Sequence, residues 1–459
     1  HDIWLKTSFV AALIQSMDQN TYDPDVMLHD LSAQDYVENY ASLVQWIAED
    51  ARDPTLGHAL LRDVRMGNRR FISRVIANVK THKQPGNMGL RIIHSSPGLC
   101  ISPAMRWISE HIRQFFSDKP HLLRDTDDLL FKLQSVVVSE SAKLVRFDIR
   151  DYFMSGSHAQ IADLAARCFP QHLQTCARAL IFFILSEQVV VIHGCEQAWK
   201  VRKGAGMGLS CAGEISDAAF YLLAEEHFAM DPEICAKNNI VFYSRFKDDG
   251  LYIVDSPREL HLQFVEQFKA KAGVYGIDFE SISYETADML DVTVFKGKKW
   301  RLTGRLDHSL YVKPSSQWRP LLCSSYHAPA VHLAWPVGMV KRFSRRFSNP
   351  HESHAAVLKF CSSLRASSGI DLNSILEERR REPSSPSPGV FSLPRLVLPY
   401  RREWMWSRVP FRFKQVVAKY ARCLGLESLM RVPPVSWSLA GPHLVTTLRR
   451  HFYDLEALG

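Results

Sequence analysis

The sequence lacks several features that would each point to a particular class of protein. Its 459 residues include nine cysteines, an odd number with no C-x-x-C pair, which argues against a disulfide framework and against a zinc ribbon. Long hydrophobic runs are also missing: the most apolar stretch, residues 179–192, is interrupted by Glu187 and Gln188 and is shorter than the roughly 20 residues of a membrane span. We therefore expect a protein of a reducing compartment with no membrane partner.

Positive charge is scarce at the start of the chain and abundant at its end. Residues 1–50 carry one Lys or Arg against nine acids, residues 51–295 are nearly neutral, and residues 296–459 carry 27 basic and 10 acidic residues. The formal net charge of +8 therefore belongs to the last third alone. Basic residues interleaved with aromatic ones there favour contact with nucleic-acid phosphates and bases, and a solvated charged face is the alternative.

The pattern of apolar residues predicts helices and strands in irregular order. Apolar positions three and four apart predict a helical region over residues 1–73, and short β-branched runs begin at residue 74. Strands are expected at 136–138 and 289–295 among other places. The order is unlike the regular alternation of a doubly wound sheet, so we predict an α+β fold. Residues 383–390, rich in Pro and Ser, are expected to form a linker.

Two apolar runs flank a pair of adjacent acids, Asp248 and Asp249, in a pattern typical of a hairpin. An Asp-Gly turn without further function is the alternative, because this pair is common in hairpins. Adjacent carboxylates repel each other, and a divalent cation shared with a third carboxylate relieves the repulsion. The candidate for the third carboxylate is Asp148, which lies near the end of the apolar run 143–149. Its alternative role is to cap the end of a strand. Three acids on adjacent strands would suit two-metal phosphoryl transfer.

Two further groups of residues could bind a nucleotide. Gly206 and Gly208 lie in a glycine-rich segment before a predicted helix, where the backbone could approach a nucleotide closely. A loop that needs positive φ is the alternative. Three basic residues on neighbouring predicted strands could clamp a triphosphate, or could simply be solvated. They are Lys80, Lys83 and Arg91.

Several segments of the chain, taken together, resemble the motifs of reverse transcriptases. The likeness is greatest to those of Penelope-like elements, extends over residues 74–348 and keeps the family's order of motifs. The matching blocks are Lys80-Thr-His-Lys83, Leu90-Arg-Ile-Ile-His-Ser-Ser96, Phe147-Asp-Ile-Arg-Asp-Tyr-Phe153, residues 204–217, Phe246-Lys-Asp-Asp249, Leu290-Asp-Val292, Tyr311-Val-Lys-Pro314 and Ser324-Ser-Tyr-His327.

The resemblance implies a right-hand polymerase and a division of the chain. Fingers are expected over residues 74–131, and a palm with an antiparallel sheet over 132–295. A primer grip and a basic, mostly helical thumb would follow over 296–382, with a basic C-terminal extension over 391–459. The implied function is RNA-directed DNA synthesis for a retroelement, in an intracellular, nuclear location. The oligomeric state is left open.

The resemblance also assigns roles to particular residues. Two ions, Mg²⁺ or Mn²⁺, would promote nucleotidyl transfer from a dNTP to the 3′-hydroxyl of a DNA primer on an RNA template. The catalytic and metal-binding residues would be Asp148, Asp248 and Asp249, with Ile149 as a further metal ligand. The nucleotide-binding residues would be Lys80, Lys83, Arg91, Phe153, Gly206 and Gly208. The nucleic-acid-binding residues would be Lys313, Arg319, Lys341, Arg342, Arg345 and Arg346.

Two other functions stay open at this point. An RNA-dependent RNA polymerase would share the acids, but Phe153 near the sugar would exclude a 2′-hydroxyl and so argues for deoxynucleotides; an ordinary core Phe is the alternative. The second open function is that of a non-catalytic nucleic-acid scaffold. It is considered because Leu209 and Lys247 depart from the family's motifs. Lys247 could pair with Asp151 or with a phosphate, or could weaken metal binding by its charge.

Overall fold

The structure is a computed structural model that divides into two compact units, residues 1–316 and 317–459. The described residues are 10–11, 13–79, 90–312, 321, 329–368, 397–399 and 436–438. Several residues of interest lie outside them, so their predicted roles remain predictions. They are Lys80, Lys83, Lys313, Arg319, the linker 383–390 and most of the extension 391–459.

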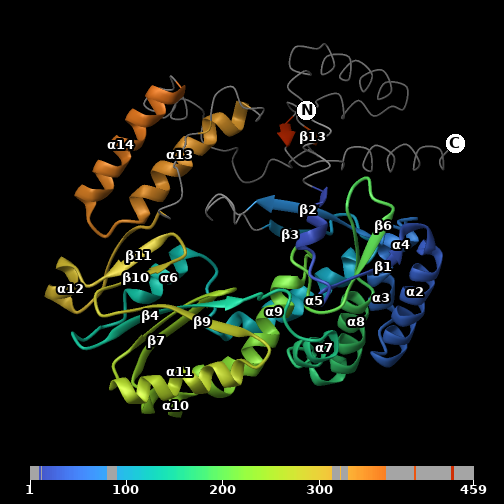
Figure 1. Ribbon diagram of the computed structural model, residues 1–459, viewed down its shortest axis with the longest axis horizontal. Coiled ribbons are helices and arrows are strands. Elements are labelled where there is room, and N and C mark those ends of the chain that lie inside the picture. Colours follow the sequence, from blue (N-terminus) through green and yellow to red (C-terminus); the bar gives the residue numbers. More distant parts are fainter. Residues whose placement is uncertain are drawn as a thin grey trace, which may run out of the picture. The chain divides into compact units, whose positions relative to one another are not determined.

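The first unit contains a four-stranded antiparallel sheet, called the central sheet below (Figure 1). Its strand order is β7 (Ile240–Phe246), β8 (Asp249–Val254), β4 (Lys143–Arg150) and β9 (Gly276–Ser283). Most of β4 and β8 is buried, because strands in the middle of a sheet covered by helices place side chains of both faces in the core. The helix α11 (Arg258–Ala272) packs on this sheet. The α+β fold class predicted from the sequence is confirmed.

A second sheet contains a strand that the sequence did not predict. Residues 22–27 fall in the region expected to be helical, yet they form β1 and pair with β6. The register of this pair shifts between Asp23 and Val26, around Pro24, because proline has no N–H to donate to the ladder. The sheet has the order β1 (Tyr22–Met27), β6 (Gln197–Val201), β5 (Val189–Val191), β2 (Ser73–Val79) and β3 (Leu90–Ser95).

Two further strand predictions need correction. The expected strand 289–295 is a hairpin, because Leu290 adopts a positive φ of 56° and turns the chain between β10 and β11. Residues 136–138 do not form a strand; instead the backbone N–H of Val138 donates to the oxygen of Gly304. The hairpin belongs to a three-stranded sheet of β10 (Thr286–Met289), β11 (Val292–Phe295) and β12 (Asp307–Leu310).

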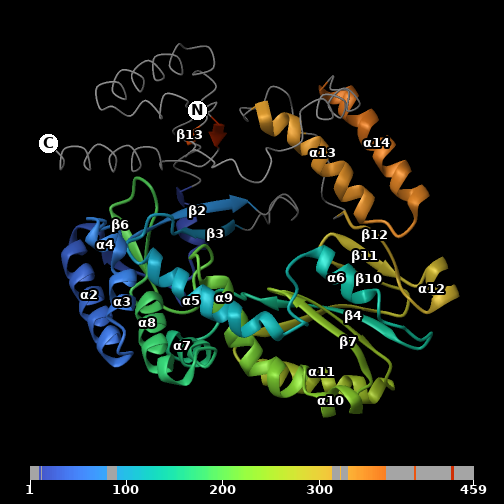
Figure 2. The same cartoon turned by 180° about the vertical axis from the view of Figure 1, so that it is seen from behind.

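Helices surround the sheets of the first unit, as Figures 1 and 2 show from opposite sides. Several of them begin at side-chain caps: for example, the Ser32 hydroxyl accepts from the backbone N–H of Asp35 at the start of α2. They are α2 (Ala33–Asp50), α3 (Pro54–Leu60), α4 (Arg62–Arg65), α5 (Ser102–Phe115), α6 (Thr126–Leu133), α7 (His158–Ala166), α8 (Gln174–Ser186), α9 (Ala212–Phe220), α10 (Pro232–Lys237) and α12 (Lys298–Thr303). A π-helix, η4 (Tyr221–Ala229), continues directly from α9. Short 3-10 turns lie at Leu28–Asp30 (η1), Phe116–Asp118 (η2) and Gln171–Leu173 (η3).

In the second unit, the helices α13 (Pro329–Arg345) and α14 (Pro350–Ser368) pack against each other. Their contact includes the rings of Phe343 and Phe360, whose centroids are 5.5 Å apart. Two short strands, β13 (Val397–Pro399) and β14 (Ser436–Ser438), pair in parallel. Across the described parts of both units, none of the helices combines the length and apolarity needed to span a membrane.

Gly250 offers a test of the packing in the central sheet. A Cβ atom at this position would lie 2.0 Å from Cζ of Phe147, a fully buried ring on the neighbouring strand. We expect Gly250→Ala to lower the free energy of unfolding by about 2–3 kcal/mol, because the core cannot make room. Denaturant unfolding measures this. The control is Gly338→Ala on α13, where a Cβ meets open space; an equal loss in the control would contradict the packing argument.

Candidate functional site

The three predicted catalytic acids lie together at one end of the central sheet. Asp148 on β4 pairs directly with Asp249 on β8, and Asp248 occupies the turn that joins β7 to β8. The backbone N–H of Ile149 donates to the oxygen of Asp248 at 2.9 Å, which extends the ladder into the turn. The prediction that the three acids lie on adjacent strands is therefore confirmed for Asp148 and Asp249, whereas Asp248 lies in the turn beside them.

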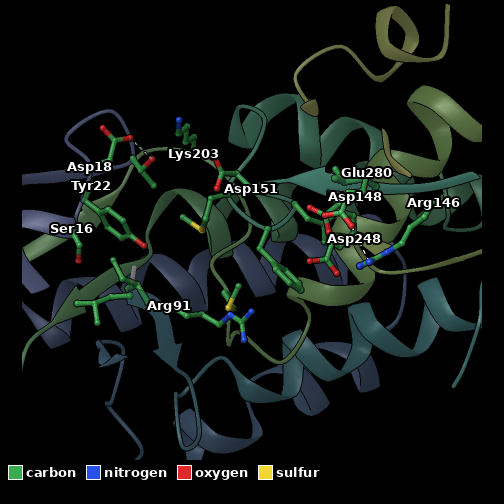
Figure 3. Close-up of a pocket in the computed structure, with 18 residues that line it drawn as sticks. Ser16, Asp18, Tyr22, Arg91, Arg146, Asp148, Asp151, Lys203, Asp248 and Glu280 are labelled. Carbon is green, nitrogen blue, oxygen red and sulfur yellow. Dashed lines mark hydrogen bonds and ion pairs between the residues drawn. The ribbon is translucent and has the colours of Figure 1, made fainter. Parts of the chain in front are cut away.

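A cavity of about 520 Å³ opens beside these acids (Figure 3). Among its lining are five of the predicted site residues: Arg91, Asp148, Ile149, Phe153 and Asp248. The remaining lining residues are Ser16, Asp18, Thr21, Tyr22, Leu90, Ile92, Arg146, Asp151, Tyr152, Met154, Lys203, Met207 and Glu280.

Asp249, in contrast, does not line this cavity, and both of its carboxylate oxygens accept hydrogen bonds from the protein. One accepts from Nε of Arg146 at 3.0 Å and the other from the backbone N–H of Leu290 at 3.1 Å. Arg146 also reaches Glu280 on β9 at 3.0 Å. Asp249 thus links β8 to β4 and to the β10–β11 hairpin, and its predicted role as a metal ligand stays a prediction.

The two predicted nucleotide-binding glycines lie against protein atoms instead of lining the cavity. A Cβ on Gly206 would lie 2.3 Å from Nε2 of Gln188, and one on Gly208 would lie 2.6 Å from the backbone oxygen of His94. Both glycines also have positive φ, at 67° and 111°. Close packing and backbone conformation therefore account for both glycines, and Met207 between them is the residue that faces the cavity.

The local electrostatics oppose ionisation of the cavity acids. Partial burial, together with the nearby charges of Asp248 and Glu280, raises the pKa of Asp148 to about 6. The pKa of Asp248 is also raised, by its reduced hydration and by the adjacent Asp249, although Arg91 acts in the opposite direction. Carboxylates that repel each other in this way would be stabilised by a bound cation.

The oxygen donors of the cavity acids fit a hard divalent cation. Among the described residues, no group of three or more His, Cys, Asp or Glu side chains is arranged to hold a metal ion. Asp148 and Asp248 nevertheless line the same cavity, and oxygen atoms are the ligands that Mg²⁺ and Mn²⁺ prefer. The shared cavity and the oxygen donors carry this fit, and the raised pKa values of both acids agree with it.

The sequence did not reveal which charged residues surround the acids, and it suggested a different partner for Lys247. Lys247 pairs with Asp217 on α9, whereas Asp151 was considered as its partner. Arg146 and Arg245 were not singled out at all, although each is a charged residue within an otherwise mostly apolar strand. That interruption was the available signal, because a charge on a buried strand requires a partner.

No family model and no curated protein matches this sequence. Among solved structures, telomerase from Candida albicans in complex with a fragment of telomeric RNA has a TM-score of 0.42 and 10% identity over 74% of this chain and 59% of that chain. The RNA-dependent RNA polymerase of a human picobirnavirus has a TM-score of 0.43 and 12% identity over 68% of this chain and 62% of that chain. The Sicinivirus RNA-dependent RNA polymerase has a TM-score of 0.43 and 11% identity over 71% of this chain and 70% of that chain.

The chain spans between about half and three-fifths of the length of the telomerase chains that it matches. The strand order and the pairing of β4 with β8 confirm the predicted α+β fold with an antiparallel sheet, and the assignment of this sheet to a polymerase palm stays a prediction.

The partial burial of Asp148 and the repulsion from nearby acids together predict an unusual effect on stability. The pKa of Asp148 is raised in the folded protein from 3.8 to about 6, so folding favours the protonated form. The free energy of unfolding of the wild type therefore falls as pH rises from about 4 to 6, because over this range the unfolded state has lost a proton that the folded state still holds. In metal-free buffer at pH 7 we expect Asp148→Asn to be more stable than the wild type by about 1 kcal/mol, once solvent screening of this half-buried group is included. The difference should vanish near pH 4. Urea unfolding with EDTA at both pH values measures it, and a less stable variant at pH 7 would contradict the assignment.

Proposed function

We propose that this chain is an RNA-directed DNA polymerase of a Penelope-like retroelement. The observation that carries the proposal is the presence of Asp148 on β4 and Asp248 in the β7–β8 turn in one cavity with the cationic Arg91. Two carboxylates beside a cationic side chain suit a reaction in which a triphosphate and metal ions must be held together.

The roles of the cavity residues follow from their positions. Asp148 and Asp248, with Ile149 and Asp249 as the further predicted ligands, would hold two Mg²⁺ or Mn²⁺ ions. Such ions activate a primer 3′-hydroxyl and neutralise charge on the triphosphate and the departing pyrophosphate. Arg91 would bind the phosphates of the incoming dNTP, since a guanidinium offers paired donors.

Nucleic-acid binding is assigned to the basic third of the chain. Four of the predicted basic residues lie at the end of α13 or directly after it: Lys341, Arg342, Arg345 and Arg346. We propose that they contact phosphates of an RNA template and a DNA primer without reading the sequence. A nuclear location accompanies this proposal.

Primer extension tests the catalytic assignment. We expect Asp148→Asn and Asp248→Asn each to reduce dNTP incorporation on a primed RNA template by about a thousandfold, because each removes a carboxylate that faces the reacting groups. Template binding, measured by fluorescence anisotropy, should persist. The matched control is Asp163→Asn, an exposed acid on α7 that pairs with Arg178. Unchanged extension by either cavity variant, or no metal-dependent extension by the wild type, would refute the proposal.

Phe153 allows the choice between deoxynucleotides and ribonucleotides to be tested. Its half-buried ring lines the cavity and lies 5.1 Å from the ring of Tyr152. If this ring excludes a 2′-hydroxyl, Phe153→Ala should raise the ratio of rNTP to dNTP incorporation by about tenfold or more. Phe131→Ala, an exposed residue on α6, is the control. A wild type that prefers rNTPs would indicate an RNA-dependent RNA polymerase instead.

A further inference from the structure

Next to the turn that carries Asp248, the structure contains a buried group of charged side chains that the proposed reaction does not use. At its centre are Arg245 on β7 and Glu225 on η4, both with fully buried side chains. Nε and NH2 of Arg245 donate to the two carboxylate oxygens of Glu225, each at 2.8 Å. The hydroxyl of Tyr243 also donates to Glu225, at 2.8 Å. Such a fully hydrogen-bonded pair is rigid, because breaking it would leave a buried charge without a partner.

The second half of this group reaches the turn itself. NH1 of Arg245 donates to Oδ1 of Asp217 at 2.9 Å and to the backbone oxygen of Lys247 at 2.8 Å. The ammonium of Lys247 in turn donates to the other oxygen of Asp217. Lys247 is therefore held to α9 both through its backbone and through its side chain, one residue before Asp248.

The backbone of Lys247 needs such support. Its φ is +55°, in the left-handed region that is strained for a residue other than glycine. This conformation allows the chain to turn between β7 and β8 and so sets the direction of Asp248. The interactions with Arg245 and Asp217 offset the cost and favour one conformation of the turn.

The group also joins the turn to the helical segment that follows the glycine-rich block. Asp217 lies on α9, and Glu225 lies on the π-helix that continues it. Gly213, in the first turn of α9, leaves space for the ammonium of Lys247: a Cβ there would lie 2.9 Å from Nζ. Any displacement of α9 would therefore be passed to Lys247 and then to Asp248.

We propose that Lys247 is a positioning residue, and that its ion pair with Asp217 holds the Asp248 carboxylate in place for a divalent cation and couples that carboxylate to α9. The catalytic readout of this inference rests on the proposed polymerase function; the metal-binding readout does not. A purely electrostatic role for Lys247 makes the opposite prediction, because removing a positive charge near the acids would then strengthen cation binding.

The experiment measures Mn²⁺ binding by electron paramagnetic resonance of the free ion, alongside primer extension, in four variants of the full chain. We expect Lys247→Met and Asp217→Asn each to weaken Mn²⁺ binding by about tenfold, the size of one charge-assisted hydrogen bond. The double variant should be no worse than Asp217→Asn alone, because the two residues act as one pair. Gly213→Ala, which displaces Nζ without changing any charge, should weaken binding in the same direction.

Two controls separate positioning from folding and from overall charge. Lys247→Arg, which keeps the charge and can still donate to Asp217, should retain most of the Mn²⁺ affinity. Lys237→Met removes an exposed lysine on α10 and should leave the affinity unchanged. Thermal unfolding midpoints identify any variant that has lost its fold. Because Gly213→Ala places a good helix former in α9, it is the variant least expected to unfold.

The outcomes separate the two proposals. Tighter Mn²⁺ binding by Lys247→Met, unchanged binding by Gly213→Ala, or additive losses in the double variant would each overturn the positioning role. Absence of primer extension by the wild type, with the predicted pattern of Mn²⁺ affinities intact, would overturn only the polymerase function. If both proposals are correct, extension rates at low Mn²⁺ fall with the affinities, and high Mn²⁺ restores most of the lost activity.

Discussion

The structure around the site is organised by the repulsion between carboxylates. Asp148 lies directly opposite Asp249, and Asp248 precedes Asp249 in the chain, so three acids converge where two strands meet a turn. Bringing like charges together raises their free energy unless cations or donors surround them. The protein provides such groups in two places, and each also ties the sheet to a neighbouring element.

The first counter-charge is Arg146, which lies between Asp249 and Glu280 and so spans three adjacent strands, β8, β4 and β9. Asp249 accepts in addition from the Leu290 backbone, which connects the sheet to the β10–β11 hairpin. The second is Arg245, whose charge acts to lower the pKa of Asp248; together with Lys247 it connects the turn to α9 through Asp217. Asp148 and Asp248 thereby remain open to the cavity while Asp249 is satisfied by the protein.

Much of the local structure could be predicted because it depends on short-range pattern. The runs that became β4 and the β7–β8 hairpin are apolar and end at acids, and strands of this kind pair wherever both faces are covered. Strand β1 could not be found in this way, since Pro24 interrupts it and only its pairing with β6 makes it a strand. The hairpin at Leu290 was missed for a related reason, as a leucine in the left-handed region gives no sequence signal of a turn.

The sequence by itself determined which residues are candidates for a functional site: an acid near the end of one apolar run, two adjacent acids at a hairpin, glycines before a helix, and a basic final third. Tertiary structure decided what each of them contacts. It directed Asp249 toward Arg146, 103 residues away, placed Gly206 and Gly208 against Gln188 and His94, and paired Lys247 with Asp217 instead of Asp151. Residue type fixes what a side chain is able to bind, whereas its actual partner depends on packing between segments far apart in the chain.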